Sequence, residues 1–317
     1  MMAVAVAVAT ALLATVILVP PVRLAAIRLG MVVPPGGRHA HATPMPTAGG
    51  VAIFAGVWLA IVVGTSVMGI WPWSAALRGV FIGSVLLLVL CVTDDARDLP
   101  ALPRLLGHIL VALIAWAHGV RIAGFGHPFY AQAAGYIPLG WLSLPLTVIW
   151  IVFLINAVNW LDGLDGLAAG VMAIASITLA IMAFSGLRST VGLMSAALAA
   201  GCVAFLFYNF NPAKVFMGDS GAMFLGYMIA CLSVLGAYKS TALVAIAAPV
   251  LVLGVPIYDT VTTVVRRLLR RKPIYSADRG HLHHRLLDRG LSVRQTVLTI
   301  YALTTLLCLV ALGLWFR

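Results

Sequence analysis

Long apolar segments alternate with short polar ones along almost the whole of this 317-residue chain. Ten of them approach the roughly 20 residues that a membrane-spanning helix needs. They cover residues 2–22, 49–70, 79–92, 105–120, 139–158, 167–184, 191–208, 222–236, 241–264 and 296–316. The third and eighth are short, which is typical of helices whose ends are buried in protein. The pattern predicts an all-α polytopic integral membrane protein with about ten transmembrane helices.

The composition supports this class. Hydrophobic residues make up 62% of the chain and charged residues only 9%, against roughly 25% charged in soluble domains. We find no internal repeat and no second soluble domain, so residues 1–317 are expected to form one transmembrane domain. The cysteines lie singly inside apolar segments, which predicts packing roles rather than a disulfide or a zinc site; they are Cys91, Cys202, Cys231 and Cys308.

The basic residues predict the orientation of the chain. No positive charge precedes the first apolar segment and Arg23 and Arg28 follow it, which favours a retained helix with its N-terminus outside over a cleaved signal peptide. Alternation then places fifteen of the 20 Lys and Arg residues on the inside, as the positive-inside rule requires. The net charge of +11 therefore reflects topology and anionic ligands, and we expect no nucleic-acid partner. The inside loops are residues 23–48, 93–104, 159–166, 209–221 and 265–295.

The acidic residues give an independent test of this orientation. All nine carboxylates are Asp; eight fall in the inside loops, and Asp259 falls in the inner part of the ninth segment. The predicted outer face carries no carboxylate. This distribution predicts a single acidic active site at the cytoplasmic face.

Residues 156–167, N-A-V-N-W-L-D-G-L-D-G-L, form the most polar interruption of the apolar pattern. If the segment is helical, Asp162 and Asp165 lie on one side, one turn apart. The alternative is that one Asp caps the helix beginning near Leu167. Capping alone does not account for Asn156 and Asn159 as well, so we favour a functional site.

Two further acidic motifs stand at helix ends. Asp94 and Asp95 close the third segment, where carboxylates oppose the helix dipole and repel each other. A bound cation or a role in proton transfer would offset this unfavourable energy. The alternative is a solvated loop in which Arg97 is the local partner of the acids. Asp219 precedes the eighth segment. It suits an N-cap, but Gly218 and Gly221 beside it would also let the backbone approach a phosphate, and carboxylates on several loops suit Mg²⁺.

The last inside loop is basic and rich in histidine. A basic run beside a membrane helix is most often an orientation signal or a headgroup contact, and this interpretation comes first for residues 266–272. His281 and His284 are expected to share a helical face beside His283, which favours a pyrophosphate-binding or acid–base role over zinc binding. Residues 36–50 are rich in Gly and Pro, and could form a flap carrying Arg38 and His41 over the site.

Together these motifs resemble, in order and spacing, the polyprenyl-phosphate N-acetylhexosamine-1-phosphate transferases. The resemblance extends over almost the whole chain, and the motifs are jointly specific although each alone is weak. They are Arg38-x-x-His41 with Pro44-x-Pro46-x-x-Gly49-Gly50, Asp94-Asp95-x-x-Asp98, Asn156-x-x-Asn159-x-x-Asp162-Gly163-x-Asp165-Gly166, residues 209–221, and His281-x-His283-His284-Arg285.

The resemblance implies transfer of a sugar 1-phosphate from a UDP-sugar to polyprenyl phosphate with release of UMP, at the cytoplasmic face of the cell inner (plasma) membrane. It implies Mg²⁺, with Mn²⁺ as a substitute. Asp219, with Asp95, resembles the metal ligands, and Asp94 and Asp95 resemble the pair that deprotonates or orients the lipid phosphate. The remaining implied roles are catalysis or handling of the sugar diphosphate by His281, His283, His284 and Arg285, and substrate binding by Arg38, His41, Asn159, Asp162, Asp165, Asn209 and Phe216.

The histidine motif resembles the branch that uses UDP-N-acetylglucosamine and undecaprenyl phosphate in cell-wall polymer synthesis. A phospho-N-acetylmuramoyl-pentapeptide transferase is the alternative within the family. An ion-coupled transporter is the alternative from another class, although its ionisable groups should lie near the bilayer midplane. The N-acetylglucosamine branch is often described with eleven helices. The number of helices, ten or eleven, and the side of the membrane on which the C-terminus lies therefore stay open at this point. The oligomeric state, which could be a homodimer, also stays open.

Overall fold

The computed structural model describes residues 1–34, 44–71, 73–97, 99–126, 136–236, 242–271 and 280–316. Arg38 and His41 lie outside the described residues. The helices are α1 (Met2–Arg28), α2 (Gly49–Val67), α3 (Ala75–Arg97), α4 (Ala101–Ala117), α5 (Ser143–Leu161), α6 (Leu167–Ser185), α7 (Ser189–Asn209), α8 (Gly218–Gly236), α9 (Ala242–Val252), α10 (Gly254–Leu269), α11 (Leu282–Leu287) and α12 (Val293–Trp315). A short 3₁₀ helix, η1 (Gly140–Leu142), precedes α5.

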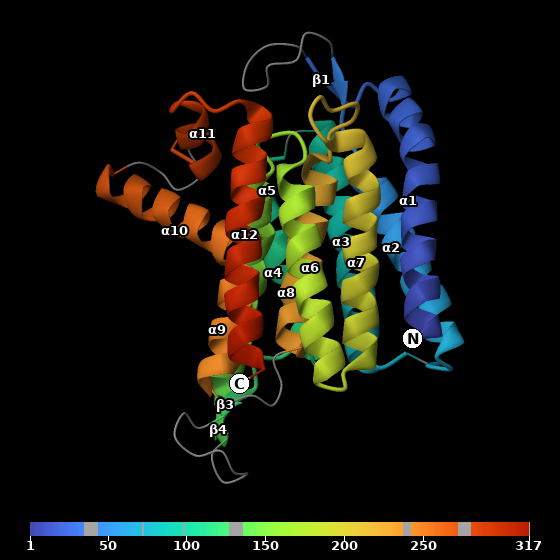
Figure 1. Cartoon of the computed structure of the whole chain (residues 1–317), viewed down its shortest axis with the longest axis vertical. Coiled ribbons are helices and arrows are strands. Elements are labelled where there is room, and N and C mark those ends of the chain that lie inside the picture. The colour runs from blue at the N-terminus through green and yellow to red at the C-terminus, as the bar shows by residue number, and fades with distance from the viewer. Residues whose placement is uncertain are drawn as a thin grey trace.

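Two short antiparallel ribbons lie at opposite ends of the helices (Figure 1). Strand β1 (Val32–Val33) pairs with β2 (Met45–Pro46), with Val32 opposite Pro46. Strand β3 (Gly124–Gly126) pairs with β4 (Tyr136–Pro138). The ribbons are too small to change the class of the fold, which is all-α.

The long helices lie side by side in one bundle, and the two chain termini lie at the same end of it (Figure 1). Among the described residues, eight helices are long and apolar enough to cross a membrane, and α4 is a shorter apolar helix. Helices α9, of 11 residues, and α10, of 16 residues, are not among these candidates in the described part of the chain. The predicted all-α polytopic membrane protein is confirmed.

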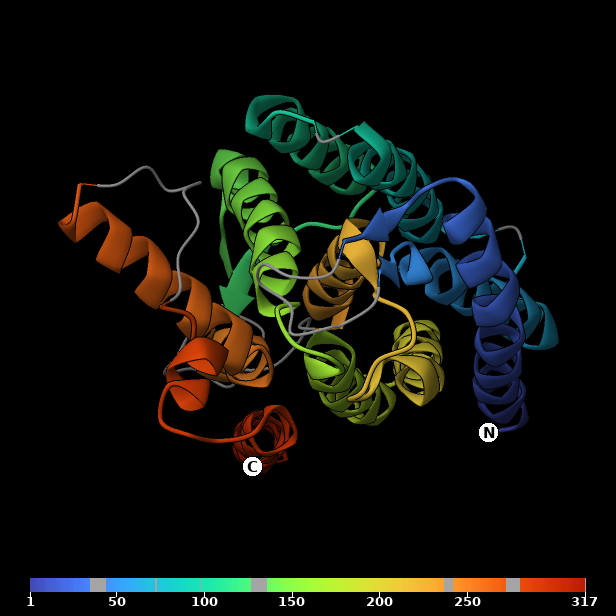
Figure 2. The ribbon, with the colours of Figure 1, turned by 90° about the horizontal axis from the view of Figure 1, so that it is seen from above.

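Helix α8 is the centre of the bundle (Figure 2). All of its residues from 220 to 234 are buried, and α2, α3, α5, α6 and α7 pack around it. A helix that is apolar on every side must be covered on every side. Glycine makes one of these contacts possible, because a Cβ at Gly226 would lie 2.6 Å from the carbonyl oxygen of Leu154 on α5. Small residues of this kind let membrane helices approach closely.

The prediction that residues 241–264 form one continuous helix is wrong. Helix α9 ends at Val252, a turn at Leu253 follows, and α10 begins at Gly254 and leaves the side of the bundle (Figures 1 and 2). Pro256 provides the physical reason: it has no N–H to donate to the carbonyl of Val252, and its ring would clash with that carbonyl in a straight helix. In the first turn of a new helix the same proline is tolerated.

The expected boundaries of the third and eighth spans were also too short. Helix α3 continues through Arg97, and α8 begins at Gly218. Asp94 and Asp95 therefore lie in the last turn of α3, and Asp219 lies in the first turn of α8. All four cysteines are buried and free, which confirms the packing role predicted for them.

We expect Gly226→Ala to lower the midpoint of thermal denaturation in detergent. The added methyl would meet the backbone of α5, with a Cβ only 2.8 Å from the Cα of Ile155, and overpacking of this kind costs about 1–3 kcal/mol. Gly313→Ala in α12 is the matched control, since a Cβ there meets nothing within 4 Å. An unchanged midpoint for Gly226→Ala alongside an unchanged control would contradict the close packing of α5 and α8.

Candidate active site

Three carboxylates and one guanidinium meet where α3, α4 and α8 end or begin at one end of the bundle. Asp94 and Asp95 come from α3, Asp219 from α8, and Arg104 from the first turn of α4. Nη1 of Arg104 lies 3.0 Å from Oδ2 of Asp94 and 3.6 Å from Oδ2 of Asp219. We call these four residues the acidic cluster. It joins two of the predicted motifs across 124 residues of sequence.

Asp94 is held on both of its carboxylate oxygens. Oδ1 accepts a hydrogen bond from the backbone N–H of Leu99 at 2.7 Å, and Oδ2 accepts one from Arg104 at 3.0 Å. The side chain is only 4% exposed. The alternative that Arg97 is the partner of this motif is therefore wrong for Asp94, whose ion pair is with Arg104. Asp94 is a fixed anion that positions the guanidinium.

Asp95 differs from its neighbour in having an oxygen to spare. Its Oδ1 accepts a hydrogen bond from the backbone N–H of Asp219 at 3.3 Å. Its Oδ2 is buried and makes no hydrogen bond of standard geometry with the described residues, although the backbone and hydroxyl of Ser220 lie close to the same carboxylate. Gly218, with φ of 72°, stands beside it, and a Cβ there would lie 3.2 Å from this oxygen. A buried carboxylate oxygen without a partner is costly, so it indicates a missing donor or cation.

The residues of the acidic cluster fit Mg²⁺ better than a transition metal. Within the described ranges, no three His, Cys, Asp or Glu side chains gather closely enough to hold an ion by themselves, which removes support for the zinc alternative. Mg²⁺ needs only one or two carboxylates, because it keeps water molecules and binds substrate phosphates. The unpartnered Oδ2 of Asp95 and the 32% exposed side chain of Asp219 are suited to that arrangement.

The start of α2 packs against the segment that leads into α8. The backbone N–H of Gly49 donates to the carbonyl of Phe216 at 3.0 Å, and that of Gly50 donates to Met217 at 2.9 Å. A Cβ at Gly50 would lie 2.1 Å from the Cα of Gly221. Gly221 is thus explained by helix packing rather than by approach of the backbone to a phosphate. These contacts bring the Pro-Gly motif beside the acidic cluster.

Asn209 is a scaffold residue in this structure. It is 2% exposed, its Oδ1 accepts a hydrogen bond from the N–H of Gly166, and its Nδ2 donates to the carbonyl of Val215, both at 3.0 Å. Its amide therefore ties the loop after α5 to the loop before α8. Both ends of the amide are therefore already hydrogen-bonded within the protein.

Asp165 belongs to the same scaffold. Its Oδ2 accepts hydrogen bonds from Nδ2 of Asn211 at 2.9 Å and from the N–H of Ala213 at 3.0 Å. The alternative that it caps the following helix is wrong, because the N-cap of α6 is Gly166 and no side chain caps it. The predicted loop between these two spans is confirmed, since α5 ends at Leu161 and α6 begins at Leu167; Asp162 and Asp165 therefore do not share a helix.

Asp162 lies at the end of α5, and its carboxylate interacts electrostatically with that of Asp219 in the acidic cluster. It is the C-cap residue, its N–H donates to the carbonyl of Asn159 at 3.2 Å, and its side chain is partly buried. Burial, and then the neighbouring carboxylates of Asp219 and Asp165, together raise the pKa of Asp162 from its ordinary value to about 7. Asn159 and Phe216 are likewise partly buried on neighbouring segments.

The histidine segment closes over the 162–166 loop. A Cβ at Gly163 would lie 2.5 Å from Nε2 of His283, so the ring packs directly on this glycine. His281 is the N-cap of α11 in extended backbone, and its ring stacks on that of His283 at 5.6 Å between centroids. The expectation that His281 and His284 share a helical face is therefore wrong. Burial, and then the neighbouring His284, lower the pKa of His283, so this ring is neutral at physiological pH.

Helix α10 supplies residues that the sequence did not single out. Asp259 accepts a hydrogen bond from Nδ1 of His281 at 2.7 Å. The guanidinium of Arg267 lies 5.0 Å from the centre of the Trp160 ring, and Arg266 donates to the carbonyl of Gly280 at 2.9 Å. Both arginines therefore make contacts within the protein, in addition to the orientation signal predicted for residues 266–272. Arg104 and Asp259 were missed as site residues because their partners are distant in sequence, although Asp259 was already the one acid outside the inside loops.

The comparisons with known proteins now decide the family. Residues 77–237 match the model of glycosyl transferase family 4. Over 95% of this chain and 82% of the relative's length, the sequence is 41% identical to a probable undecaprenyl-phosphate N-acetylglucosaminyl 1-phosphate transferase of Bacillus subtilis. The chain belongs to glycosyl transferase family 4.

Two other relatives mark the breadth of family 4. A decaprenyl-phosphate N-acetylglucosaminephosphotransferase of Mycobacterium tuberculosis is 33% identical over 92% of this chain and 78% of its own length. A phospho-N-acetylmuramoyl-pentapeptide-transferase of Desulforudis audaxviator is 33% identical over 99% of this chain and 98% of its own. The segment matched by the family 4 model runs from α3 to just past α8 and contains the whole acidic cluster.

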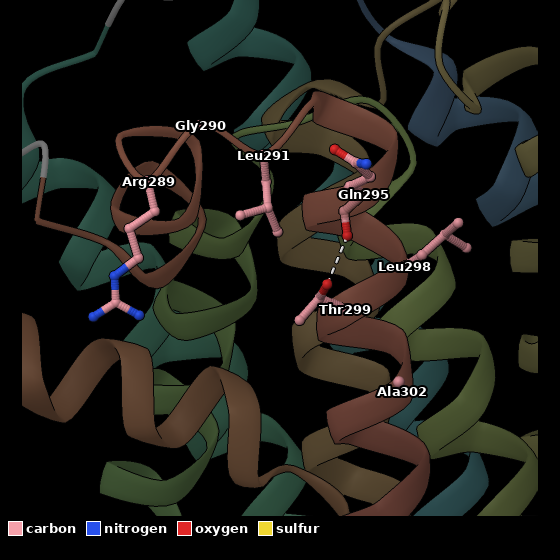
Figure 3. Close-up of a pocket in the computed structure, with 7 residues that line it drawn as sticks. All are labelled: Arg289, Gly290, Leu291, Gln295, Leu298, Thr299 and Ala302. Carbon is pink, nitrogen blue, oxygen red and sulfur yellow. Dashed lines mark hydrogen bonds between the residues drawn. The ribbon is translucent and has the colours of Figure 1, made fainter.

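A surface pocket lies apart from these residues, beside the N-terminal end of α12 (Figure 3). The turn after α11 and one side of α12 form it, and the hydroxyl of Thr299 there donates to the carbonyl of Gln295 at 2.8 Å. The acidic cluster and the histidines do not contribute to it. Its lining residues are Arg289, Gly290, Leu291, Gln295, Leu298, Thr299 and Ala302.

We expect Asp162→Asn to raise the thermal stability of the ligand-free protein at pH 8 and to leave it unchanged at pH 4. A carboxyl whose pKa is raised to about 7 in the folded protein binds its proton more tightly there than in the unfolded chain, so its contribution to stability falls as the pH rises from about 4 to 7. Asn cannot ionise and removes that loss. Denaturation midpoints in detergent, with EDTA present, measure the difference, and a stabilisation equal at both pH values would contradict the assignment.

Proposed function

We propose that this protein transfers N-acetylglucosamine 1-phosphate from UDP-N-acetylglucosamine to undecaprenyl (polyprenyl) phosphate and releases UMP. The acidic cluster is the observation that carries this proposal. A membrane chain of family 4 brings three carboxylates and an arginine from three helix ends to one place, which is a site for phosphoryl transfer. The names of the relatives from Bacillus subtilis and Mycobacterium tuberculosis support the sugar and the lipid.

The reaction is a displacement at phosphorus. An oxygen of the lipid phosphate attacks the β-phosphorus of the UDP-sugar, a new P–O bond forms, and the bond from that phosphorus to the α–β bridging oxygen breaks. UMP leaves with the bonding electron pair. The products are a polyprenyl pyrophosphoryl sugar and UMP, and no oxidant or further reactant is required.

The acidic cluster would position and neutralise the phosphates. Asp95 and Asp219 would hold Mg²⁺, which supplies positive charge to the phosphate oxygens when bound. Arg104, fixed by Asp94 at 3.0 Å, presents its guanidinium to the same space and can bind a phosphate oxygen. Asp95 also has the unpartnered oxygen needed to accept a proton from, or to orient, the lipid phosphate.

The other motifs would form the walls of the site. Asn159, Asp162 and Phe216 lie on segments next to the acidic cluster and are proposed for the nucleotide, with Asn209 and Asp165 as the scaffold that sets their loops. His281, His283, His284 and Arg285 are proposed for the sugar diphosphate. Arg38 and His41 keep their predicted substrate-binding role, which the described residues do not test.

The position of the site supports a cytoplasmic face of the cell inner membrane. The described parts of the predicted inside loops 23–48, 93–104, 159–166 and 209–221 lie at the end of the bundle opposite the chain termini, as do α11 and the start of α12 from the fifth loop, whereas the end of α10 projects to the side (Figure 1). The five loops hold fifteen of the 20 basic residues. UDP-sugars are made in the cytoplasm, so the donor would reach the site from that side.

Purified protein with undecaprenyl phosphate and Mg²⁺ should release UMP from UDP-N-acetylglucosamine in preference to other donors. The panel is UDP-N-acetylgalactosamine, UDP-glucose and UDP-N-acetylmuramoyl-pentapeptide, and mass spectrometry identifies the lipid product. Preference for the pentapeptide donor would move the protein to the other branch of family 4. Absence of UMP from every donor, with the lipid present, would refute the transferase itself.

Asp95→Asn and Asp219→Asn should each lower kcat by about 100-fold or more, since each removes a charge that acts on the phosphates in the transition state. EDTA should stop the wild-type reaction, and added Mg²⁺ should restore it; Mn²⁺ is the expected substitute. Asp288→Asn is the control, because Asp288 is exposed at the end of α11. Turnover that persists in EDTA would exclude the metal role of both residues.

A further inference from the structure

One side of α10 carries polar residues that are buried against the histidine segment. Asp259, Thr263 and Arg267 follow at helical spacing and are 2%, 0% and 5% exposed. The opposite side of the helix is apolar and exposed, with Val261 and Val265 both more than 40% exposed. A helix with this division turns its polar face towards the protein. Asp259 is the acid on this buried face.

Asp259 uses both carboxylate oxygens on the start of α11. Oδ2 lies 2.7 Å from Nδ1 of His281, and Oδ1 accepts the backbone N–H of Leu282 at 2.6 Å. An ionised carboxylate only accepts hydrogen bonds, so Nδ1 of His281 must carry the proton. In the neutral imidazole, Nε2 is then the acceptor. This is the arrangement by which a carboxylate sets the tautomer and orientation of a working histidine.

Neighbouring groups hold the same ring from other directions. The hydroxyl of Thr263 lies 3.4 Å from Nδ1 of His281 and accepts a hydrogen bond from Nη2 of Arg266 at 3.2 Å. The ring stacks nearly parallel to that of His283, with 5° between planes, and lies 6.2 Å from the ring of Trp160. The ring of His281 is therefore held by groups on α10, α5 and α11.

We propose that Asp259 is a positioning residue for His281, fixing it as an Nδ1–H imidazole whose Nε2 accepts a hydrogen bond or proton in the transfer reaction. The proposal rests on the proposed function for the chemistry of Nε2, but the tautomer is a property of the protein alone. The competing explanation is that Asp259 only anchors the first turn of α11 through Leu282.

Asp259→Asn separates the two explanations. The Asn oxygen can still accept the N–H of Leu282, but its NH₂ group would face Nδ1 of His281 and would require the opposite tautomer. We expect kcat for UMP release to fall about 10- to 100-fold, with KM for the UDP-sugar changed less than threefold. Asp288→Asn, the same chemical change at the exposed residue that ends α11, is the control and should leave kcat unchanged.

A double-mutant cycle tests whether Asp259 acts through His281. If it does, Asp259→Asn should have no further effect on kcat in a His281→Gln background. The proposal would be overturned if the fold-reductions in kcat caused by the two single substitutions multiplied in the double variant. It would also be overturned if the Asp259→Asn enzyme had the wild-type kcat. Lack of UMP release by the wild-type enzyme would instead count against the proposed function.

Nitrogen NMR gives a readout that does not depend on turnover. In protein labelled with ¹⁵N in the histidine rings, the signals lost on His281→Gln belong to His281, and we expect them to show a protonated Nδ1 in the wild type. Asp259→Asn should shift them to the Nε2–H pattern. A wild-type His281 protonated on Nε2 alone would overturn the proposal, even if the Asp259→Asn variant failed to fold.

Discussion

The complete burial of α8 is the constraint on which the rest of the structure depends. Since residues 220 to 234 are covered on every side, this helix cannot move without repacking five neighbours, and its first turn is fixed in space. Asp219 in that turn is therefore placed by the packing of the apolar core. The N–H of the same residue donates to Asp95, so the position of α8 also sets the distance between the two acids proposed to bind metal.

Within the described residues, the acidic cluster is electrostatically incomplete. Three carboxylates share one guanidinium, and two of the three lie at the C-terminal end of α3, where the helix dipole disfavours negative charge. Their place on α3 and the hydrogen bonds to Leu99, Arg104 and the N–H of Asp219 hold them there. Such an arrangement lowers the stability of the ligand-free protein and favours a ligand that brings positive charge, which is consistent with the Mg²⁺ site proposed above.

The hydrophobic pattern predicted the membrane-spanning helices well, because about 20 apolar residues are needed to cross a bilayer and few other structures need them. The distribution of Asp predicted which loops meet. Contacts between distant segments could not be predicted in this way: the break before α10 depends on the position of Pro256 relative to Val252, and the scaffold role of Asn209 depends on its meeting Gly166 and Val215. Arg104 and Asp259 have partners far away in sequence or on another helix, so no local pattern marked them.

The hydrogen bonds of the aspartates separate scaffold from chemistry. Asp94 and Asp259 have both oxygens occupied by protein donors, and Asp165 holds two donors on one oxygen; each of these fixes another group in place. Asp95 retains a buried oxygen without a partner in the described structure, and Asp219 has one arginine at 3.6 Å. A carboxylate whose oxygens already accept hydrogen bonds from the protein gains little free energy from binding a substrate group. A carboxylate with an oxygen that accepts none gains the most from binding a cation or a proton. The number of hydrogen-bond donors that the fold supplies to each aspartate thus distinguishes the structural aspartates from those proposed to bind metal or accept a proton.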